Sequence, residues 1–267
     1  MNARDFATSL LEATSLDGKL APPPADLVLE DPLPAVIVRA PGRPATLPIA
    51  PGRSVTVPPL AGMRDPQQRA RILHALANHE LQAAELFAWA LLAFPDAPRG
   101  FRAGLVGILR DEQRHCAMYL DRLAAHGMAF GDCPVTGHFW GKLDQLATPL
   151  SFVCAMGLTF ENANLDFAGE YAQAARAAGD HETARVLEEV HEDEIGHVRF
   201  AATWVGKLAP DRDAWDVYAS TVRFPLGAAR ARGASFDADA RRRAGLDERF
   251  IAELAAAAPK RPGGGAR

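Results

Sequence analysis

The chain has 267 residues, of which 48% are apolar and 23% charged, and its formal net charge is −4. These are ordinary values for a soluble globular protein, and this charge gives no general reason to expect a nucleic-acid partner. The three cysteines lack CxxC spacing, which argues against a disulfide framework or a zinc ribbon and favours a reducing compartment.

The longest apolar stretches, residues 86–94 and 150–160, are shorter than the roughly 20 residues that a membrane span requires. The first residues also lack the long apolar segment of a secretory signal. We therefore expect a cytoplasmic protein that does not associate with a membrane.

Eleven of the 20 prolines fall between residues 21 and 60. Proline in a helix interior costs about 3 kcal/mol, so this segment cannot be regular helix. We expect residues 1–64 to form an extended proline-rich arm with a short helix around Phe6. Apolar residues such as Leu29, Ile37 and Leu47 suggest that this arm packs on the rest of the protein.

Residues 65–209 are predicted to form four long helices, because each candidate segment carries apolar residues at helical spacing. Pro66 suits the first turn of a helix, whereas Gly127 and Gly179 suit helix ends. Helices of roughly 25 residues span about 38 Å and are typical of an antiparallel four-helix bundle. The predicted helices are 65–94, 99–126, 149–178 and 181–208.

The C-terminal part is expected to add two short helices, around residues 214–224 and 247–257, within an extension that covers residues 210–257. Residues 258–267 contain Pro-Gly-Gly-Gly and are expected to be a disordered tail. The predicted fold class is therefore all-α.

A carboxylate interrupts the apolar stripe of each long helix, and in two of the helices a histidine follows three residues later. An isolated buried carboxylate is very costly, so such a group must be paired or bound to metal. Because residues i and i+3 share a helix face, each Glu-x-x-His pair can aim at one centre. The six candidate ligands are Glu80, Glu112, His115, Glu161, Glu194 and His197.

The spacing of these residues supports the same reading. Glu80 precedes Glu112 by 32 residues, and Glu161 precedes Glu194 by 33 residues. The chain thus contains two helical hairpins, each with a lone Glu followed by Asp-Glu-x-x-His. Four Glu and two His in a bundle core are the ligand set of ferritin-like proteins that bind two iron or two manganese ions.

Glu188 and His191 form another Glu-x-x-His pair on the fourth helix. His191 precedes His197 by six residues, a rotation of about 240°, so both pairs cannot contribute equally to one centre. The hairpin spacing favours Glu194 and His197, and His191 is expected at the surface or as an outer partner.

Metal-bound histidine needs a partner for its second ring nitrogen, and Asp111 and Asp193 are the candidates. Tyr119 lies one turn beyond His115 and could serve in redox chemistry or hydrogen bonding, although a core role is the simpler reading. Glu85 and Asp166 each follow a lone Glu by five residues and are more typical of salt bridges than of ligands.

Several stretches resemble the uncharacterised ferritin-like proteins grouped as DUF455. The likeness covers roughly residues 1–257 and is strongest at the motifs that contain the six candidate ligands. It implies a ferritin-like fold and a dinuclear metal site, and it extends distantly to a di-iron hydroxylase of a modified adenosine in transfer RNA. The resembling stretches are APGRPATLP, HALANHELQAAELFAWAL, DEQRHCAMYLDRLAAHG, FGDCPV, GDHETARVLEEVHEDEIGHV and DADARRRAGLDERFIAEL.

The segment TFENANLDF departs from the family's usual wording at Asn164, where a small Gly is more common, but it keeps Glu161 and Asp166. The ligand set therefore survives, whereas the shape of a substrate pocket can differ.

The leading hypothesis is a di-iron oxidase or hydroxylase that activates O₂ and acts on an unknown small substrate. Carboxylate and imidazole ligands suit iron, manganese or a mixed pair, and no organic cofactor is predicted. The alternatives are a ferroxidase or iron-handling protein, a manganese catalase-like enzyme, and a non-catalytic metal-binding bundle. The electron donor is unknown, and a homo-oligomer is compatible with the sequence.

Residues 223–267 carry ten Lys or Arg against five Asp or Glu, whereas residues 61–222 are acidic. A basic tail is more often a solvated surface than an RNA site, so modified transfer RNA is not the expected substrate.

Overall fold

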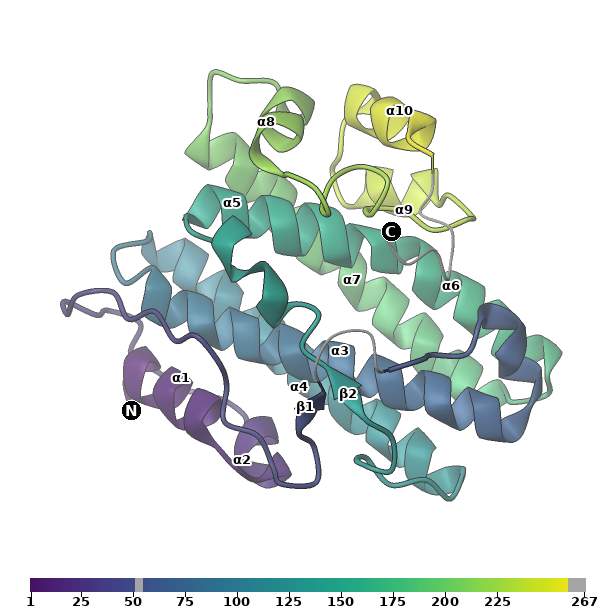
Figure 1. Cartoon of the computed structure of the whole chain (residues 1–267). Helices are drawn as coiled ribbons and strands as arrows, with labels where there is room; N and C mark the ends of the chain where they lie inside the picture. Colours follow the sequence, from purple (N-terminus) through teal and green to yellow (C-terminus); the bar gives the residue numbers. More distant parts are fainter. Residues whose placement is uncertain (51–54, 259–267) are drawn as a thin grey trace. The chain divides into compact units, whose positions relative to one another are not determined.

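The computed structural model of the protein describes residues 1–50 and 55–258 and is predominantly helical (Figure 1). This confirms the predicted all-α class. Residues 259–267 of the predicted tail lie outside the described residues. Among the described helices, none combines the length and the apolar character needed to cross a membrane.

The chain divides into two compact units, each of which contains a long helical hairpin. The first comprises Met1–Pro58 and Asp65–Asp144, and the second comprises Pro59–Arg64 and Gln145–Arg267. The predicted division into arm, bundle and extension stays a prediction.

In the first unit, α3 (Pro66–Ala93) and α4 (Arg99–Ala125) pack along each other (Figure 1). Asp65 caps α3 by accepting a hydrogen bond from the backbone N–H of Gln68, and Pro66 occupies the first turn. Gly127 ends α4 with a φ of 71°, a conformation that favours glycine. The boundaries predicted from Pro66 and Gly127 are thus confirmed.

The other elements of the first unit are short. The helix α1 packs on α3 and contains Phe6, as predicted, whereas the second short helix and the small parallel sheet were not predicted. These elements are α1 (Ala3–Glu12), α2 (Leu16–Leu20), β1 (Ile49–Ala50), β2 (Val135–Thr136) and η2 (Trp140–Gln145), the last of which ends at the unit's boundary.

The described part of the proline-rich segment contains no helix after α2 until η1. Leu29 and Leu47 are buried as expected, but Ile37 is 49% exposed, so the expectation that it packs was wrong. Hydrogen bonds hold the segment instead, since Trp89 Nε1 donates to the Val38 carbonyl at 3.0 Å and Arg102 Nε donates to the Leu29 carbonyl at 2.8 Å. A buried arginine can satisfy several carbonyls of a chain that lacks its own hydrogen-bond ladder.

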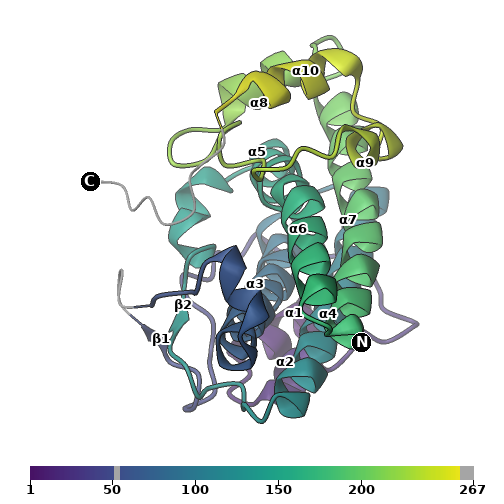
Figure 2. The same ribbon diagram turned by 90° about the vertical axis from the view of Figure 1, so that its right-hand side faces the viewer.

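In the second unit, the predicted helix 149–178 consists of three consecutive segments, and the middle one is π-helical. These segments are α5 (Pro149–Ala155), η3 (Met156–Glu161) and α6 (Asn162–Ala177). Gly179 ends α6 with a φ of 79°, and α7 (His181–Leu208) then packs along α6 (Figure 2). The predicted fourth helix is confirmed at both ends.

The remaining elements of the second unit are short helices at its C-terminal end, together with η1 (Leu60–Arg64), which packs on α6. They are α8 (Ala214–Thr221), α9 (Ala238–Arg243) and α10 (Glu248–Ala256). The sequence predicts α8 and α10, but it does not predict α9, because Ala-Asp-Ala-Arg-Arg-Arg has no apolar periodicity.

Candidate functional site

The first unit brings Glu80, Glu112 and His115 together in a cluster that we call the first triad. Glu80 lies on α3, and the other two lie one turn apart on α4. All three are buried, and each offers a ligand atom that lies within 4.8 Å of the others. His115 Nδ1 is 3.8 Å from Glu112 Oε2.

The second unit contains the second triad, which consists of Glu161, Glu194 and His197. Glu161 ends the π-helical segment η3, and the other two lie one turn apart on α7. All three are buried, and their ligand atoms also lie within 4.8 Å of one another. His197 Nδ1 lies 3.2 Å from Glu194 Oε2. Each hairpin therefore brings together the three candidate ligands that the sequence pattern assigned to it.

The π-helical segment positions Glu161. A π-turn contains one more residue than an α-turn, so it rotates the following side chains around the helix axis. Thr159 accommodates this turn by donating its hydroxyl to the Cys154 carbonyl, five residues earlier, at 2.9 Å. Gly157 allows close packing, since a Cβ there would lie 2.2 Å from the Ala201 Cβ on α7. Such π-segments occur frequently at functional sites.

Asn164 also belongs to the surroundings of the second triad. Its side-chain nitrogen donates to Glu194 Oε1 at 2.7 Å. From the sequence we predicted only that Asn164 can alter the shape of a substrate pocket. Its place three residues after Glu161, on the same helix face, is the signal that could have indicated this contact.

The donor set of each triad fits a metal ion. Two carboxylates and an imidazole, all buried, are costly without a compensating charge. Oxygen and imidazole donors suit Fe(II) and Mn(II), whereas soft thiolates favour zinc or copper(I). The buried acidic and histidine groups could therefore hold metal ions.

The family comparison matches one model, DUF455, described as a protein of unknown function, over residues 6–252. The chain belongs to the DUF455 family. Comparisons with curated proteins and with solved structures returned no match. The span matched in this DUF455 protein includes both triads and most of the residues that surround them.

The predicted outer partners differ in their surroundings. Asp111 is half-exposed and lies 3.7 Å from Arg114 on the same helix of this DUF455 protein. Asp193 is partly buried on α7, and Tyr119 is buried on α4, one turn beyond His115. The roles predicted for these three residues stay predictions.

His191 lies outside the triads and is partly buried. Its Nε2 is 3.4 Å from Asp237 and its Nδ1 is 3.8 Å from Glu192. Glu188, its partner in the alternative Glu-x-x-His pair, forms an exposed ion pair with Arg176. The alternative pair thus faces away from the ligand set, which is consistent with the rotation estimated from its spacing.

Glu85, which was included among the candidate site residues, forms ion pairs instead. Its Oε1 lies 3.0 Å from Lys19 Nζ, and its Oε2 lies 2.7 Å from Arg43 Nη2. Trp140 Nε1 also donates to Oε2 at 2.8 Å. Five residues rotate Glu85 about 140° from Glu80, so it faces the arm rather than the first triad.

Asp166, the corresponding residue of the second unit, is likewise a salt-bridge residue. Arg241 is fully buried and donates to both carboxylate oxygens, at 2.8 and 2.9 Å. The backbone N–H groups of Gly233 and Asp237 donate to the same carboxylate, each at 2.8 Å. Asp166 therefore holds the segment around α9 against α6.

The three cysteines provide a direct check on burial near the triads. Burial raises the pKa of Cys116 to about 12 and the pKa of Cys154 to about 12. At pH 8 only about one such thiol in ten thousand is ionised, and the thiolate is the reactive form.

Iodoacetamide should therefore modify partly exposed Cys133 in the folded protein and leave Cys116 and Cys154 intact. Peptide mass spectrometry would show this, and protein unfolded in urea, in which all three should react, is the control. Rapid modification of Cys116 in folded protein would contradict its burial.

Proposed function

We propose that the two triads together hold two metal ions in one dinuclear centre and that the two hairpins form a ferritin-like bundle. The observation that carries this proposal is the repetition of one buried ligand set in two hairpins. In each, a lone Glu precedes a Glu-x-x-His pair by 32 or 33 residues. A single triad supplies only three ligands, whereas two iron ions in a bundle core typically share four carboxylates and two imidazoles.

We further propose that this centre is an O₂-dependent oxidase or hydroxylase. A pair of iron ions in such a ligand set can supply two electrons to O₂ without an organic cofactor. The protein's own contribution is to hold the carboxylates in place and keep bulk water away. Buried apolar side chains that could exclude water occur within a few residues of the proposed ligands in the sequence. Ala84 and Phe87 follow Glu80 on α3, and Leu158 precedes Glu161.

The second triad also illustrates how this chain can orient a ligand. The Asn164 side chain donates to one oxygen of Glu194, and His197 Nδ1 lies close to the other. The carboxylate is thereby held from both sides, which fixes the direction of its remaining lone pairs. Outer partners of this kind usually matter 10- to 100-fold for metal affinity or activity.

The test is metal analysis of protein expressed with iron and manganese both available, followed by measurement of O₂ uptake after chemical reduction. We expect two metal ions per chain, mainly iron, and stoichiometric O₂ consumption. Two bound iron ions without O₂ consumption would reject the oxidase proposal.

The same preparation separates the alternatives. A large multi-subunit particle that accumulates iron would indicate an iron-handling protein. Rapid disproportionation of peroxide by a manganese-loaded sample would indicate a catalase-like enzyme. Protein that binds no metal at any supplied concentration would contradict the dinuclear centre itself.

A further inference from the structure

A row of four buried polar side chains on α3 holds the loop that follows α4. His74 Nε2 accepts a hydrogen bond from the Gly131 backbone N–H at 3.0 Å, and Asn78 Nδ2 donates to the Thr136 carbonyl at 3.0 Å. Gln82 Oε1 accepts from the Phe139 backbone N–H at 3.1 Å, and Glu85 accepts from the Trp140 indole N–H at 2.8 Å. We call these four side chains the polar ladder; they are His74, Asn78, Gln82 and Glu85.

The spacing of the polar ladder explains how it works. Successive members are four, four and three residues apart, so all four lie on one face of α3. Each is at most 3% exposed, and a buried polar group is costly unless it is hydrogen-bonded. Four such bonds along residues 131–140 hold this loop by directional contacts, which define its path more narrowly than apolar packing would.

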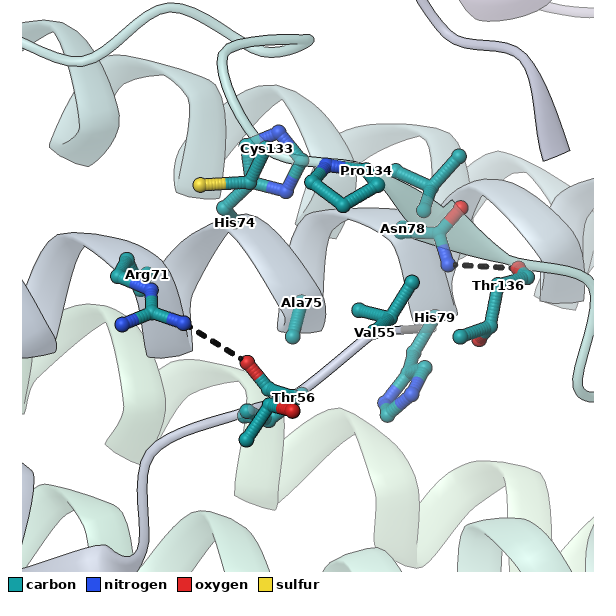
Figure 3. Close-up of a pocket in the computed structure, with 12 residues that line it drawn as sticks. Val55, Thr56, Arg71, His74, Ala75, Asn78, His79, Cys133, Pro134 and Thr136 are labelled. Carbon is teal, nitrogen blue, oxygen red and sulfur yellow. Dashed lines mark hydrogen bonds between the residues drawn. The ribbon is translucent and has the colours of Figure 1, made fainter. Parts of the chain in front are cut away.

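The loop held in this way lines two pockets on the first unit, of about 200 Å³ and about 510 Å³. The first lies between α3, residues 55–57 and residues 133–136 (Figure 3). The second continues past β1 and β2 to η2. His79 and Thr136 line both pockets, so we treat the pair as one groove, the loop groove.

The described side chains that line the loop groove include cations and neutral donors but no Asp or Glu. Arg71 and Lys142 supply positive charge, and Arg71 is held at the rim by donating Nη2 to the Thr56 carbonyl at 3.0 Å (Figure 3). The imidazoles of His79 and His138 add polar groups to the second pocket. The nearby acids Asp132 and Asp144 are exposed and line neither pocket.

His74 contributes to the structure of the groove rather than to its charge. Burial lowers the pKa of His74, which favours the neutral imidazole. A neutral Nε2 can accept the Gly131 N–H bond, which a protonated ring could not. Among the described residues of the groove, the positive charge therefore comes from Arg71 and Lys142.

We propose that the loop groove binds a small molecule through an oxyanion, either a carboxylate or a phosphate. Guanidinium and ammonium groups beside neutral N–H and hydroxyl donors are the usual recognition elements for such a group. Successive residues of a helix are rotated by about 100° around its axis. On α3, the side chain of His79 therefore lies between the face that carries the polar ladder and the face that carries Glu80. The groove thus adjoins the helix that supplies the first triad, and, on the proposed function, its ligand is the substrate.

The test is a calorimetric titration of the metal-free full-length protein with inorganic phosphate and, separately, with acetate. We expect saturable binding of at least one anion, weakened by added salt because the recognition is electrostatic. R71Q and K142Q should each weaken this binding about tenfold, whereas the matched control R110Q, at an exposed position of α4, should not. Unchanged melting temperatures would show that the exposed Arg71 substitution leaves the fold intact.

The outcomes separate this proposal from the proposed function. Binding that is lost in R71Q and K142Q but kept in R110Q supports the groove, even if the metal-loaded protein consumes no O₂. No saturable binding of either anion overturns it, even if O₂ is consumed. Equal weakening in all three variants would also overturn it, because the effect would then reflect net charge alone. The anion that binds more tightly identifies the substrate group as phosphate or carboxylate.

Discussion

Replacing Glu112 or Glu194 by Ala is expected to reduce the bound metal from two ions per chain to less than one, and to abolish reduction-dependent O₂ uptake. Each residue supplies a buried carboxylate to its triad and is the first member of a Glu-x-x-His pair. Loss of even an outer partner of a metal ligand commonly costs 10- to 100-fold in affinity, and loss of a ligand itself should cost more. Elemental analysis of the purified variants, paired with an oxygen electrode, measures both effects.

The matched control for this experiment is Glu188→Ala. Glu188 and His191 have the same spacing on the same helix as Glu194 and His197, but Glu188 is half-exposed and pairs with Arg176. We expect Glu188→Ala to retain the full metal content. If Glu188→Ala loses metal as Glu194→Ala does, the ligand assignment on α7 is wrong.

The metal-free variants provide a second readout. Without metal, the clustered carboxylates are buried close to one another, which is costly. Replacing one of them should therefore leave the melting temperature of the metal-free protein unchanged or higher, while removing the increase that metal produces in the wild type. A large loss of stability in the metal-free Glu112→Ala protein would indicate that this carboxylate is structural.

Replacing Asp166 by Ala is expected to destabilise the protein by about 3–5 kcal/mol, the range typical of breaking a buried ion pair. Asp166 accepts four hydrogen bonds, and its loss would leave the fully buried Arg241 guanidinium without its carboxylate. Urea unfolding followed by circular dichroism measures the effect. The matched control is Glu248→Ala, which removes the exposed pair with Arg242 and should cause no measurable change.

A double variant separates the charge from the packing. In Asp166→Leu with Arg241→Met, both charges are absent and side chains of similar length remain. Much of the lost stability should return, because the main penalty of the single variant is an uncompensated buried charge. If Asp166→Ala behaves like Glu248→Ala, then Asp166 is not the anchor of the α9 segment.

The long helices could be predicted because their signals are local. Asp65 and Pro66 begin α3, and glycines with positive φ follow α4 and α6 at residues 127 and 179. The two Glu-x-x-His pairs could be predicted for the same reason, since a spacing of three residues on one helix places both side chains on one face. The third member of each triad, the lone Glu, could be predicted from its distance of 32 or 33 residues to the Glu-x-x-His pair.

Other features depend on contacts between residues far apart in the chain. The side chain of Asp166 is satisfied by groups 67 to 75 residues later, and Glu85 is paired with Lys19 and Arg43 from the arm. Helix α9 forms where Arg241 reaches this carboxylate, although its own sequence has little periodicity. No local pattern identifies such partners, so the sequence favoured salt bridges for these two acids but could not show which residues they pair with.

The sequence by itself determined the all-α class, the ends of the long helices and the two repeated sets of two Glu and one His, because capping, proline and glycine geometry and helical periodicity act over a few residues. Only the tertiary structure decided which acids gather with a histidine in a buried cluster, which residues pair with Glu85 and Asp166, where the π-helical turn positions Glu161, and how the polar ladder holds the loop beside α3. The physical reason is that a buried polar group needs a partner wherever the fold brings one, and that partner is set by packing and not by neighbours in sequence.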